Sequence, residues 1–374
     1  MLMKPKVSLV RCTNYEAALV SKAVKEAVDL IGGITNFIRP QSRVLVKPNL
    51  LLGTGPESGI TTHPEVVRAV IKLLKGINCK IFLGDAPWAS NTQIDNVDEV
   101  YKNSGMKMVS EEEGIELVKF DKRRWREKFP LAAWLDHCDY LVSIPKLKTH
   151  EVTVLTAAIK NLFGLVSGPY RLELHKKYFP RREFARMLVD VYQETRPALT
   201  VVDGITAMEG DGPGTGGKTR QAGLLLAGSD AVALDSVAAI IMGIEPFSIP
   251  TTREAARRGL GEADIAQIEV LGEKLKDVIG KPFQLPVSSM ARKLPRPVVE
   301  IAKKLIRFYP KIDDHNCIRC GTCIRACPKK VISMRANKVV IDYRGCISCF
   351  CCQEACPASA IKIKRSLLAK IAGL

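Results

Sequence analysis

Two cysteine runs near the C-terminus have the residue types and the spacing to bind iron–sulfur clusters. Each run fits the pattern C-x2-C-x2-C-x3-C-P. Three cysteines at such intervals let a tight loop reach three corners of one cluster, and the fourth lies a helical turn further on and points toward a second cluster. The runs therefore predict two [4Fe-4S] clusters with crossed ligands. Cluster 1 would be held by Cys317, Cys320, Cys323 and Cys356, and cluster 2 by Cys346, Cys349, Cys352 and Cys327.

The two runs form an internal repeat, in which residue 346 and its neighbours align with residue 317 and its neighbours. In this alignment Cys351, the fifth cysteine of the second run, lies opposite Thr322 and not at a ligand position. We expect Cys351 to be a small packed side chain beside a cluster, and a regulatory thiol is the alternative. Zinc is the main rival for the runs, but zinc ligands usually occur as two C-x2-C pairs with a long gap between them.

A second group of residues that could bind or react with a ligand lies within the first 285 residues, mostly directly after the apolar runs. Ligands of open α/β sheets bind outside the carboxyl ends of the strands, so these positions are the natural place for a site. Clustered lysines there would hold a carboxylate or a phosphate. The catalytic candidates are Lys146, Lys148, His150 and Asp85, and the candidates for an anion site are Lys47, Asn49, Lys160 and Asn161.

Other interpretations of these residues stay open. The side chains of His63, Asp85, His150 and His175 could instead bind a metal ion. Alternatively, these residues are charged side chains of exposed loops, together with a buried histidine whose hydrogen bonds are made within the protein. We place the stretch KLKTH, residues 146–150, in a loop after a strand. For this stretch we favour a functional site over loop charges without a functional role. Arg171 and His175 are also expected in a loop, whereas the segment with Lys160 predicts a helix.

The glycine-rich stretch GPGTGGKT, residues 212–219, fits the phosphate-binding pattern G-x-x-x-x-G-K-[ST]. That pattern needs a strand directly before it and a helix directly after it. Here the preceding predicted strand ends at Asp203, and the residues that follow, TRQAGLLLAG, are typical of another strand. A flexible glycine-rich lid over the strand ends is therefore favoured over a nucleotide site.

The elements that must position these residues alternate along the chain to about residue 280. Short apolar runs predict strands at 6–10, 43–47, 80–85, 115–120, 140–144, 199–203, 223–227 and 268–272, with helical patterns at 15–31, 64–76 and 182–194. The predicted fold is α/β, a mainly parallel sheet with helices on both faces, plus a small C-terminal ferredoxin-like α+β module. The predicted domains are 1–285, a proline-rich linker with a basic helix at 286–311, and a two-[4Fe-4S] domain at 312–374.

The net charge and the distribution of apolar residues indicate where the protein is located and what kinds of partner it binds. The formal net charge is +17, and two clusters, each leaving about −2 with its four thiolates, lower it to about +13. A basic surface favours an acidic redox partner or an anionic small molecule, or serves solubility alone, and no nucleic-acid-binding module is recognisable. No export signal and no transmembrane segment are predicted, so we expect a cytoplasmic protein. The linker helix could lie on a membrane surface, although packing on a domain is favoured.

The cysteine module resembles a bacterial-type ferredoxin with two [4Fe-4S] clusters, although free ferredoxins of this type are usually acidic. The stretches VLVKPNLL, TTHPEVVRAV, PKLKTH, AAIKNLFG, VVDGITAMEGDGPG and GSDAVALDSVAA resemble the family known as Domain of Unknown Function 362. Some members of that family carry a ferredoxin module behind this domain. The resemblance implies that the Lys and His loops and the GP-containing loop are family features, and it implies no particular reaction.

Three functions are compatible with these features. The leading hypothesis is a redox protein, an oxidoreductase of unknown substrate if it is an enzyme, in which two clusters pass single electrons to or from an anionic ligand or partner at the α/β domain. The second is a non-catalytic electron carrier or assembly factor that docks an acidic partner. The third is an ATPase that uses residues 212–219 as a P-loop and couples turnover to electron transfer.

Overall fold

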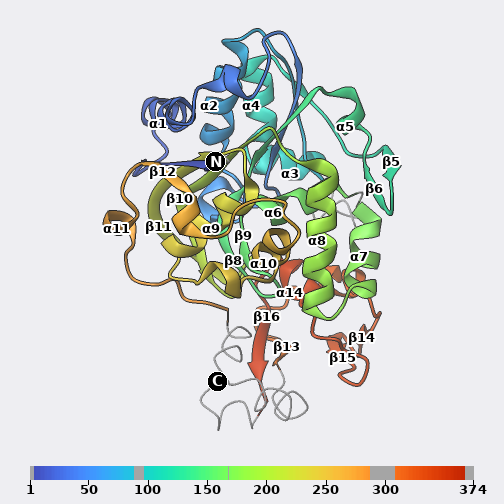
Figure 1. The fold of residues 1–374 in the computed structure, drawn as a ribbon. Coiled ribbons are helices and arrows are strands. Elements are labelled where there is room, and N and C mark those ends of the chain that lie inside the picture. The colour runs from blue at the N-terminus through green and yellow to red at the C-terminus, as the bar shows by residue number, and fades with distance from the viewer. Residues whose placement is uncertain (1–3, 88–96, 167, 287–307, 367–374) are drawn as a thin grey trace.

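Ten strands of the described residues form one mixed sheet at the centre of the α/β domain (Figure 1). The computed structural model describes residues 4–87, 97–166, 168–286 and 308–366. The strand order is β12-β1-β11-β10-β7-β2-β3-β4, and β8 and β9 branch from β10. Neighbouring strands are parallel from β10 to β4, whereas β11 runs antiparallel to β1 and to β10. The predicted mainly parallel sheet is confirmed.

Eight of these ten strands overlap the apolar runs of the sequence, whereas β8 and β9 correspond to none of them, and β10 and β11 are longer than predicted. The sheet contains β1 (Lys6–Arg11), β2 (Arg43–Pro48), β3 (Lys80–Leu83), β4 (Glu116–Leu117), β7 (Tyr140–Ile144), β8 (Lys146–His150), β9 (Val154–Thr156), β10 (Leu199–Gly210), β11 (Gly217–Gly228) and β12 (Glu269–Gly272). A separate hairpin consists of β5 (Arg123–Arg126) and β6 (Phe129–Ala132).

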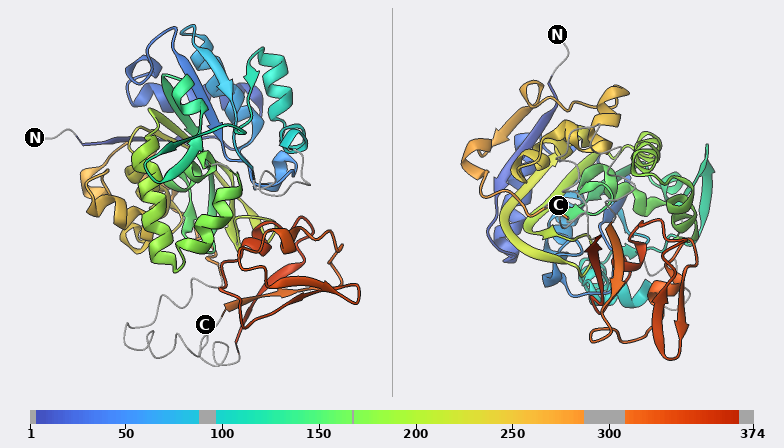
Figure 2. Two further views of the ribbon diagram at one scale, coloured as in Figure 1. Left: turned by 90° about the vertical axis from the view of Figure 1, so that its right-hand side faces the viewer. Right: turned by 90° about the horizontal axis from the view of Figure 1, so that it is seen from below.

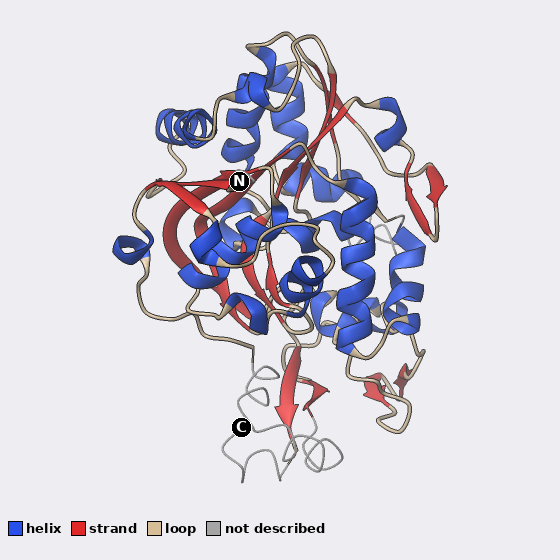
Figure 3. Cartoon of the chain, in the orientation of Figure 1, coloured by secondary structure: helices blue, strands red, loops and turns tan. Residues whose placement is uncertain are grey.

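Helices cover both faces of the sheet (Figure 3). Successive side chains of a strand point to opposite faces, and in β2 the side chains of Val44 and Val46 enter one apolar core while Leu45 enters the other. The first core includes residues of α1 (Ala17–Leu30) and α2 (Pro64–Lys75), and the second includes residues of α8 (Arg181–Thr195) and α9 (Ala231–Ile241). The other helices of this domain are α3 (Val97–Asn103), α4 (Met106–Glu113), α5 (Trp134–His137), α6 (Ala158–Asn161), α7 (Gly168–Lys177), α10 (Pro250–Arg257) and α11 (Leu275–Val278).

The cysteine module lies against one end of the α/β domain (Figure 2). It pairs β13 (Phe308–Ile312) with β16 (Ile361–Arg365) and β14 (Ile332–Arg335) with β15 (Lys338–Ile341), both antiparallel. Each cysteine run carries one short helix, α13 (Thr322–Arg325) in the first and α14 (Cys351–Glu354) in the second. The ferredoxin-like α+β module expected from the sequence is present.

Two local predictions were wrong. The stretch KLKTH is strand β8 and not a loop, because it pairs with β10 on one side and β9 on the other. Arg171 and His175 lie on helix α7 and not in a loop. The basic helix and most of the proline-rich linker predicted at 286–311 fall outside the described residues, and the three domain boundaries stay predictions. Within the part of the chain that the structure describes, no helix is both long and apolar enough to span a membrane.

Candidate functional site

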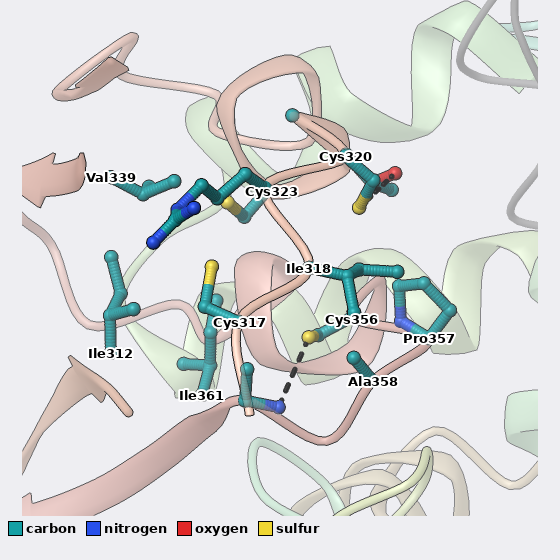
Figure 4. A pocket seen from close by; sticks show the side chains of 14 residues that line it. Ile312, Cys317, Ile318, Cys320, Cys323, Val339, Cys356, Pro357, Ala358 and Ile361 are labelled. Carbon is teal, nitrogen blue, oxygen red and sulfur yellow. Dashed lines mark hydrogen bonds between the residues drawn. The ribbon is translucent and has the colours of Figure 1, made fainter. Parts of the chain in front are cut away.

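Each of two cavities in the C-terminal module is lined by four of the cysteines. The first is lined by Cys317, Cys320, Cys323 and Cys356, whose sulfur atoms point into the same space (Figure 4). The second is lined by Cys327, Cys346, Cys349 and Cys352. Each set joins three cysteines of one run with the last cysteine of the other. These are the sets that crossed ligation predicts, and their assignment as ligands stays a prediction.

The chemistry of the donor sets fits iron–sulfur clusters. Four thiols surround each cavity, and the rest of its lining is largely apolar, with Ile312, Val339 and Ile361 at the first. The amide of Ala360 donates a hydrogen bond to Cys356 Sγ, 3.3 Å away, which is the kind of contact that tunes a cluster. Among the described residues, no three His, Cys, Asp or Glu side chains converge tightly enough to hold a single metal ion.

Left-handed backbone conformations shape both cysteine loops. Gly321 precedes α13 with a φ of 74°, and Phe350 precedes α14 with a φ of 61°. Each turns the chain into a short helix from which one cysteine, Cys323 or Cys352, lines its cavity. Phe350 adopts this unfavourable conformation while its ring is buried, so its packing stabilises what glycine provides at no cost in the first run.

Helix α14 joins the cluster module to the α/β domain. The amide group of Gln353 donates a hydrogen bond to the carbonyl of Asp211, 2.8 Å away. The hydroxyl of Thr215 donates to the carbonyl of Cys356, also 2.8 Å away, and the hydroxyl of Ser359 donates to the carbonyl of Thr215. The helix with one proposed cluster ligand, and the turn with another, are thus held by the glycine-rich stretch of the α/β domain.

The contact with α14 accounts for the glycines of this stretch, so a nucleotide-binding site is not needed to explain them. Residues 211–216 connect β10 to β11 as a hairpin loop, and Lys218 lies on strand β11. The strand-to-helix context of a P-loop is absent here, as the sequence interpretation favoured. A Cβ on Gly214 would lie 2.9 Å from the carbonyl oxygen of Glu354, and one on Gly216 would collide with the side chain of Gln353. Glycine is therefore needed for the close approach of α14.

An apolar contact lies beside these hydrogen bonds. Cys351 is fully buried in a cluster with Cys349, Ala326 and Ala355, and Leu51, Leu172 and Phe179 of the α/β domain pack against it. Cys351 does not line either cavity. Its environment agrees with a small packed side chain, because the hydrogen bond with Cys349, and then burial, raise the pKa of its thiol well above the ordinary value.

Two predicted site lysines form buried ion pairs with strand-end carboxylates. Lys47 Nζ lies 2.7 Å from Asp85 Oδ1, and Lys146 Nζ lies 2.8 Å from Asp203 Oδ2. All four side chains are at most 1% exposed. Asp85 also accepts a hydrogen bond from the amide of Leu50. Lys47 and Lys146 are therefore already neutralised, and they organise the site more than they could capture a ligand.

Asn161 connects the first of these pairs to the neighbouring strands. Its side-chain oxygen accepts hydrogen bonds from Lys47 Nζ and from the side-chain amide of Asn49, and its own amide donates to Ser143 Oγ. The four predicted anion-site residues are therefore not equivalent, because Lys47, Asn49 and Asn161 bind one another. Lys160, one residue before Asn161 on α6, is the member left for a ligand.

Lys148 and Lys160 lack such partners. Among the described residues, no carboxylate oxygen lies within ion-pair distance of either ammonium group: Lys148 Nζ donates to the carbonyl of Ile60 at 2.6 Å, and Lys160 Nζ lies 5.0 Å from the ring centre of Phe163. Burial, and then the charge of Lys160, lower the pKa of Lys148 to about 7. Burial lowers the pKa of Lys160 to about 8, although part of its side chain reaches solvent. The two ammonium groups of Lys148 and Lys160 therefore place unpaired positive charge in the region of the α/β domain that α14 covers, which we describe as lying beneath α14.

Glu354 of α14 enters this positive region from the cluster module. Its Oε1 lies 3.5 Å from Nε2 of His150, and both side chains are buried. His150 Nδ1 accepts hydrogen bonds from the amides of Val152 and Thr153, so the proton of the neutral ring resides on Nε2 and faces Glu354. Burial raises the pKa of Glu354 to about 7, and burial lowers the pKa of His150 well below its ordinary value.

The histidines do not form the metal site that the sequence left open. The ring of His63 stacks on Tyr15 with 3.6 Å between ring centres, and its Nδ1 accepts a hydrogen bond from the amide of Glu65 at the start of α2. The ring of His175 stacks on Phe184. With His150 turned toward Glu354, these side chains serve separate places in the described part of the α/β domain.

Several site residues escaped sequence reasoning. The hydroxyl of Tyr15 donates to Asp203 Oδ1 and accepts from Lys146 Nζ at 2.7 Å, so the phenol belongs to the strand-end network. No sequence signal marked Tyr15, which lies between the first strand and the first helix. Glu354 could have been suspected, because it is the single acidic residue among the cysteines of the second run.

Comparisons with known proteins agree with this architecture. A family model described as Domain of unknown function (DUF362) matches residues 44–240, and a model described as 4Fe-4S dicluster domain matches residues 309–357. The "Thylakoid-associated protein sll1697" of Synechocystis sp. is 35% identical over 265 residues, which are 69% of this chain and 81% of that protein.

Structural similarity adds little to this result. The lactate racemase apoprotein of Thermoanaerobacterium thermosaccharolyticum aligns with a TM-score of 0.36 at 14% identity, over 54% of this chain and 50% of that one, which is too weak to support an argument. The two-cluster domain gives the protein the capacity for electron transfer through two [4Fe-4S] clusters. The chain belongs to the DUF362 family and carries a C-terminal 4Fe-4S dicluster domain.

Proposed function

We propose that this protein is a redox protein in which two [4Fe-4S] clusters exchange single electrons with an anionic small molecule bound beneath α14. Cluster 1 is held by Cys317, Cys320, Cys323 and Cys356, and cluster 2 by Cys346, Cys349, Cys352 and Cys327. The clusters supply the electron chemistry, and the α/β domain binds and orients the ligand. Lys148 and Lys160 attract the anion, while Lys47 and Lys146 hold the frame through their carboxylate partners.

One observation carries this proposal. Helix α14 contains Cys352, which lines the second cavity, and ends at Glu354, which is buried against His150 of the strand-end site. A single helix of four residues therefore connects a cluster cavity with the candidate binding site. Electron transfer between a cluster and a ligand needs such proximity, and a freely diffusing carrier would not need its clusters fixed to a second domain.

The unbalanced charge supports an anion as the ligand. Lys47 and Lys146 each have a carboxylate partner. Glu354 lies near Lys148 and Lys160, and Asp85 also lies near Lys148, but among the described residues no carboxylate forms an ion pair with either lysine. Burying ammonium groups without partners is costly, and proteins retain such groups mainly where function needs them. A carboxylate or a phosphate would balance the charge.

The experiment starts from anaerobically purified holoprotein. Released small molecules are identified by mass spectrometry, and the clusters are followed by iron content and electron paramagnetic resonance. If the proposal is right, an anion copurifies or binds, its binding alters the spectrum of a reduced cluster, and Lys148→Met together with Lys160→Met abolishes both effects with iron content unchanged. Unaltered spectra and no bound anion in either protein would refute the ligand site.

The alternative of a non-catalytic carrier or assembly factor predicts a different result. Such a protein binds an acidic partner with an affinity that falls steeply as salt rises, and it turns nothing over. The ATPase alternative lacks a P-loop context, and ATP turnover that survives Lys218→Ala would eliminate it. A cytoplasmic location stays our prediction, and the name of the cyanobacterial relative, which refers to the thylakoid, makes association with a membrane the competing location.

A further inference from the structure

The internal repeat gives the module two equivalent faces, of which only one is covered. The equivalent residues Ile318 and Ile347 follow the first cysteine of each run. Ile347 packs against the apolar contact with the α/β domain, together with Cys349. Ile318 is 66% exposed, and Cys320, the equivalent of Cys349, is also exposed. The same loop of the repeat is therefore buried in the second run and open to solvent in the first.

The covered loop shows what this kind of face does when it has a partner. Leu51, Leu172 and Phe179 of the α/β domain pack against the buried cluster that contains Cys349 and Cys351, and Cys349 also lines the second cavity. The α/β domain thus acts as the internal partner of cluster 2. Neither cavity is lined by described residues from outside the module, but Ile318, Cys320 and Pro357 at the rim of the first cavity are exposed (Figure 4).

The charges of the two faces are opposite. In the second run Glu354 enters a positive site of the α/β domain. The equivalent position in the first run is Arg325, whose guanidinium donates hydrogen bonds to the carbonyl of Cys320 and to Thr322 Oγ1. Arg319, beside Cys320, is exposed as well. The open face therefore combines an exposed apolar residue with Arg319 in the lining of the cavity and Arg325 bonded to the neighbouring loop, whereas the covered face carries a carboxylate.

We propose that the open face, formed by Ile318, Arg319, Cys320 and Arg325, docks an acidic redox protein that exchanges electrons with cluster 1. One electron leaves the reduced partner and reduces cluster 1, so the partner is oxidised by one electron and no atoms are transferred. The electron then passes to cluster 2, beside the α/β domain. Carboxylates of the partner meet the arginines, and an apolar side chain covers Ile318. The inference rests on the electron-transfer part of the proposed function and not on the anion site.

The test measures binding and electron transfer with the full-length holoprotein. The probe is a small acidic two-[4Fe-4S] ferredoxin, titrated in its oxidised form by calorimetry over a range of salt, and mixed in its reduced form by stopped flow. Arg319→Asp is expected to weaken binding about tenfold at low salt and to slow reduction accordingly, because it reverses a charge at the rim. Asp suits the positive φ of residue 319, so the loop is expected to fold. Ile318→Ala is expected to weaken binding about fivefold at every salt concentration.

Lys330→Asp is the matched control. Lys330 is also exposed, has a φ of 54° and undergoes the same change of charge, but it does not line the first cavity. We expect less than about a twofold effect from it. Iron content and the spectrum of each reduced cluster verify that every variant retains both clusters.

The remaining outcomes overturn the proposal. Equal losses in Arg319→Asp and Lys330→Asp would mean that only overall charge matters. No loss in Arg319→Asp and Ile318→Ala would place the entry point elsewhere. Binding of anionic phospholipid vesicles that depends on Arg319, without binding of the ferredoxin, would make a membrane the occupant. A Lys148→Met result against the anion site would leave this face standing, so the two proposals fail separately.

Discussion

Replacement of Lys148 by Met separates a ligand-binding lysine from a structural one, because the two roles predict opposite effects on stability. The pKa of Lys148 falls from 10.5 to about 7, mainly through burial. At about 1.4 kcal/mol per pH unit, this difference corresponds to about 5 kcal/mol, an upper limit for the cost of the buried charge. Met fills a similar volume without the charge, but it leaves the carbonyl of Ile60 without its hydrogen bond, which costs about 1–3 kcal/mol. The ligand-free variant should therefore be more stable near pH 7, by about 2 kcal/mol.

The pH dependence gives a second signature of the same charge. Because the pKa of Lys148 is lowered in the folded state, the unfolded chain binds more protons between about pH 7 and pH 10.5, and folding stability rises with pH across that window. Below about pH 7 both states carry the proton, so the full cost of the charge is present. Lys148→Met should remove this rise, and the advantage of the variant over the parent should shrink as pH increases.

The assay is chemical denaturation of the holoprotein under anaerobic conditions, at several pH values, with and without the copurified anion or inorganic phosphate. The anion should stabilise the parent protein and leave the variant unchanged. Lys218→Met is the control, because this exposed residue of β11 carries the lysine of the P-loop pattern and should affect neither stability nor binding. A ligand-free Lys148→Met protein that is less stable than its parent, with an unchanged response to the anion, would show that Lys148 is structural and refute the reasoning.

Three further substitutions test separate parts of the structure. Gly214→Ala should loosen α14, because its Cβ would lie 2.9 Å from a backbone oxygen of that helix. We expect faster amide hydrogen exchange in α14. Gly55→Ala is the control, because a Cβ at Gly55 meets nothing within 4 Å. Cys351→Ser should retain about eight irons per chain and cost about 1–3 kcal/mol of stability through its buried hydroxyl, and a loss of four irons would contradict the ligand assignment. Burial raises the pKa of Asp235 from 3.8 to about 7, so stability should fall between about pH 4 and pH 7 by up to about 4 kcal/mol, and Asp235→Asn should flatten that part of a denaturation series.

The strands and the cysteine module could be predicted because their signals are local. A strand buried on both faces is a continuous apolar run, and the runs at 43–47 and 140–144 became β2 and β7. The spacing of the cysteines must match the size of a cluster, so the spacing predicts which four cysteines converge. Each cavity is lined by one of these predicted sets. In both cases a few adjacent residues contain the information.

The environment of the lysines could not be predicted, because it depends on contacts between distant segments. Lysine is rarely buried, and its occurrence at alternate positions of KLKTH indicates an exposed loop or edge. In the structure β8 pairs with two strands, and Asp203, 57 residues from Lys146, neutralises the first lysine. Sequence reasoning selected both Lys146 and Lys148 as candidate site residues, and these assignments stay predictions. It could not distinguish the two lysines, since the carboxylate partner of Lys146 comes from a distant strand.

The glycine-rich stretch shows how one pattern can serve two purposes. Glycines at residues 212, 214, 216 and 217 let a backbone approach another group closely, and a phosphate and a helix both require that. The residues that follow decide between them: a helix after the glycines would present its amides to a phosphate, whereas β11 continues away as a strand and leaves the loop to contact α14. Because Thr215 of this loop donates a hydrogen bond to the carbonyl of Cys356, any movement of the loop should be transmitted to this residue, which is a predicted ligand of cluster 1.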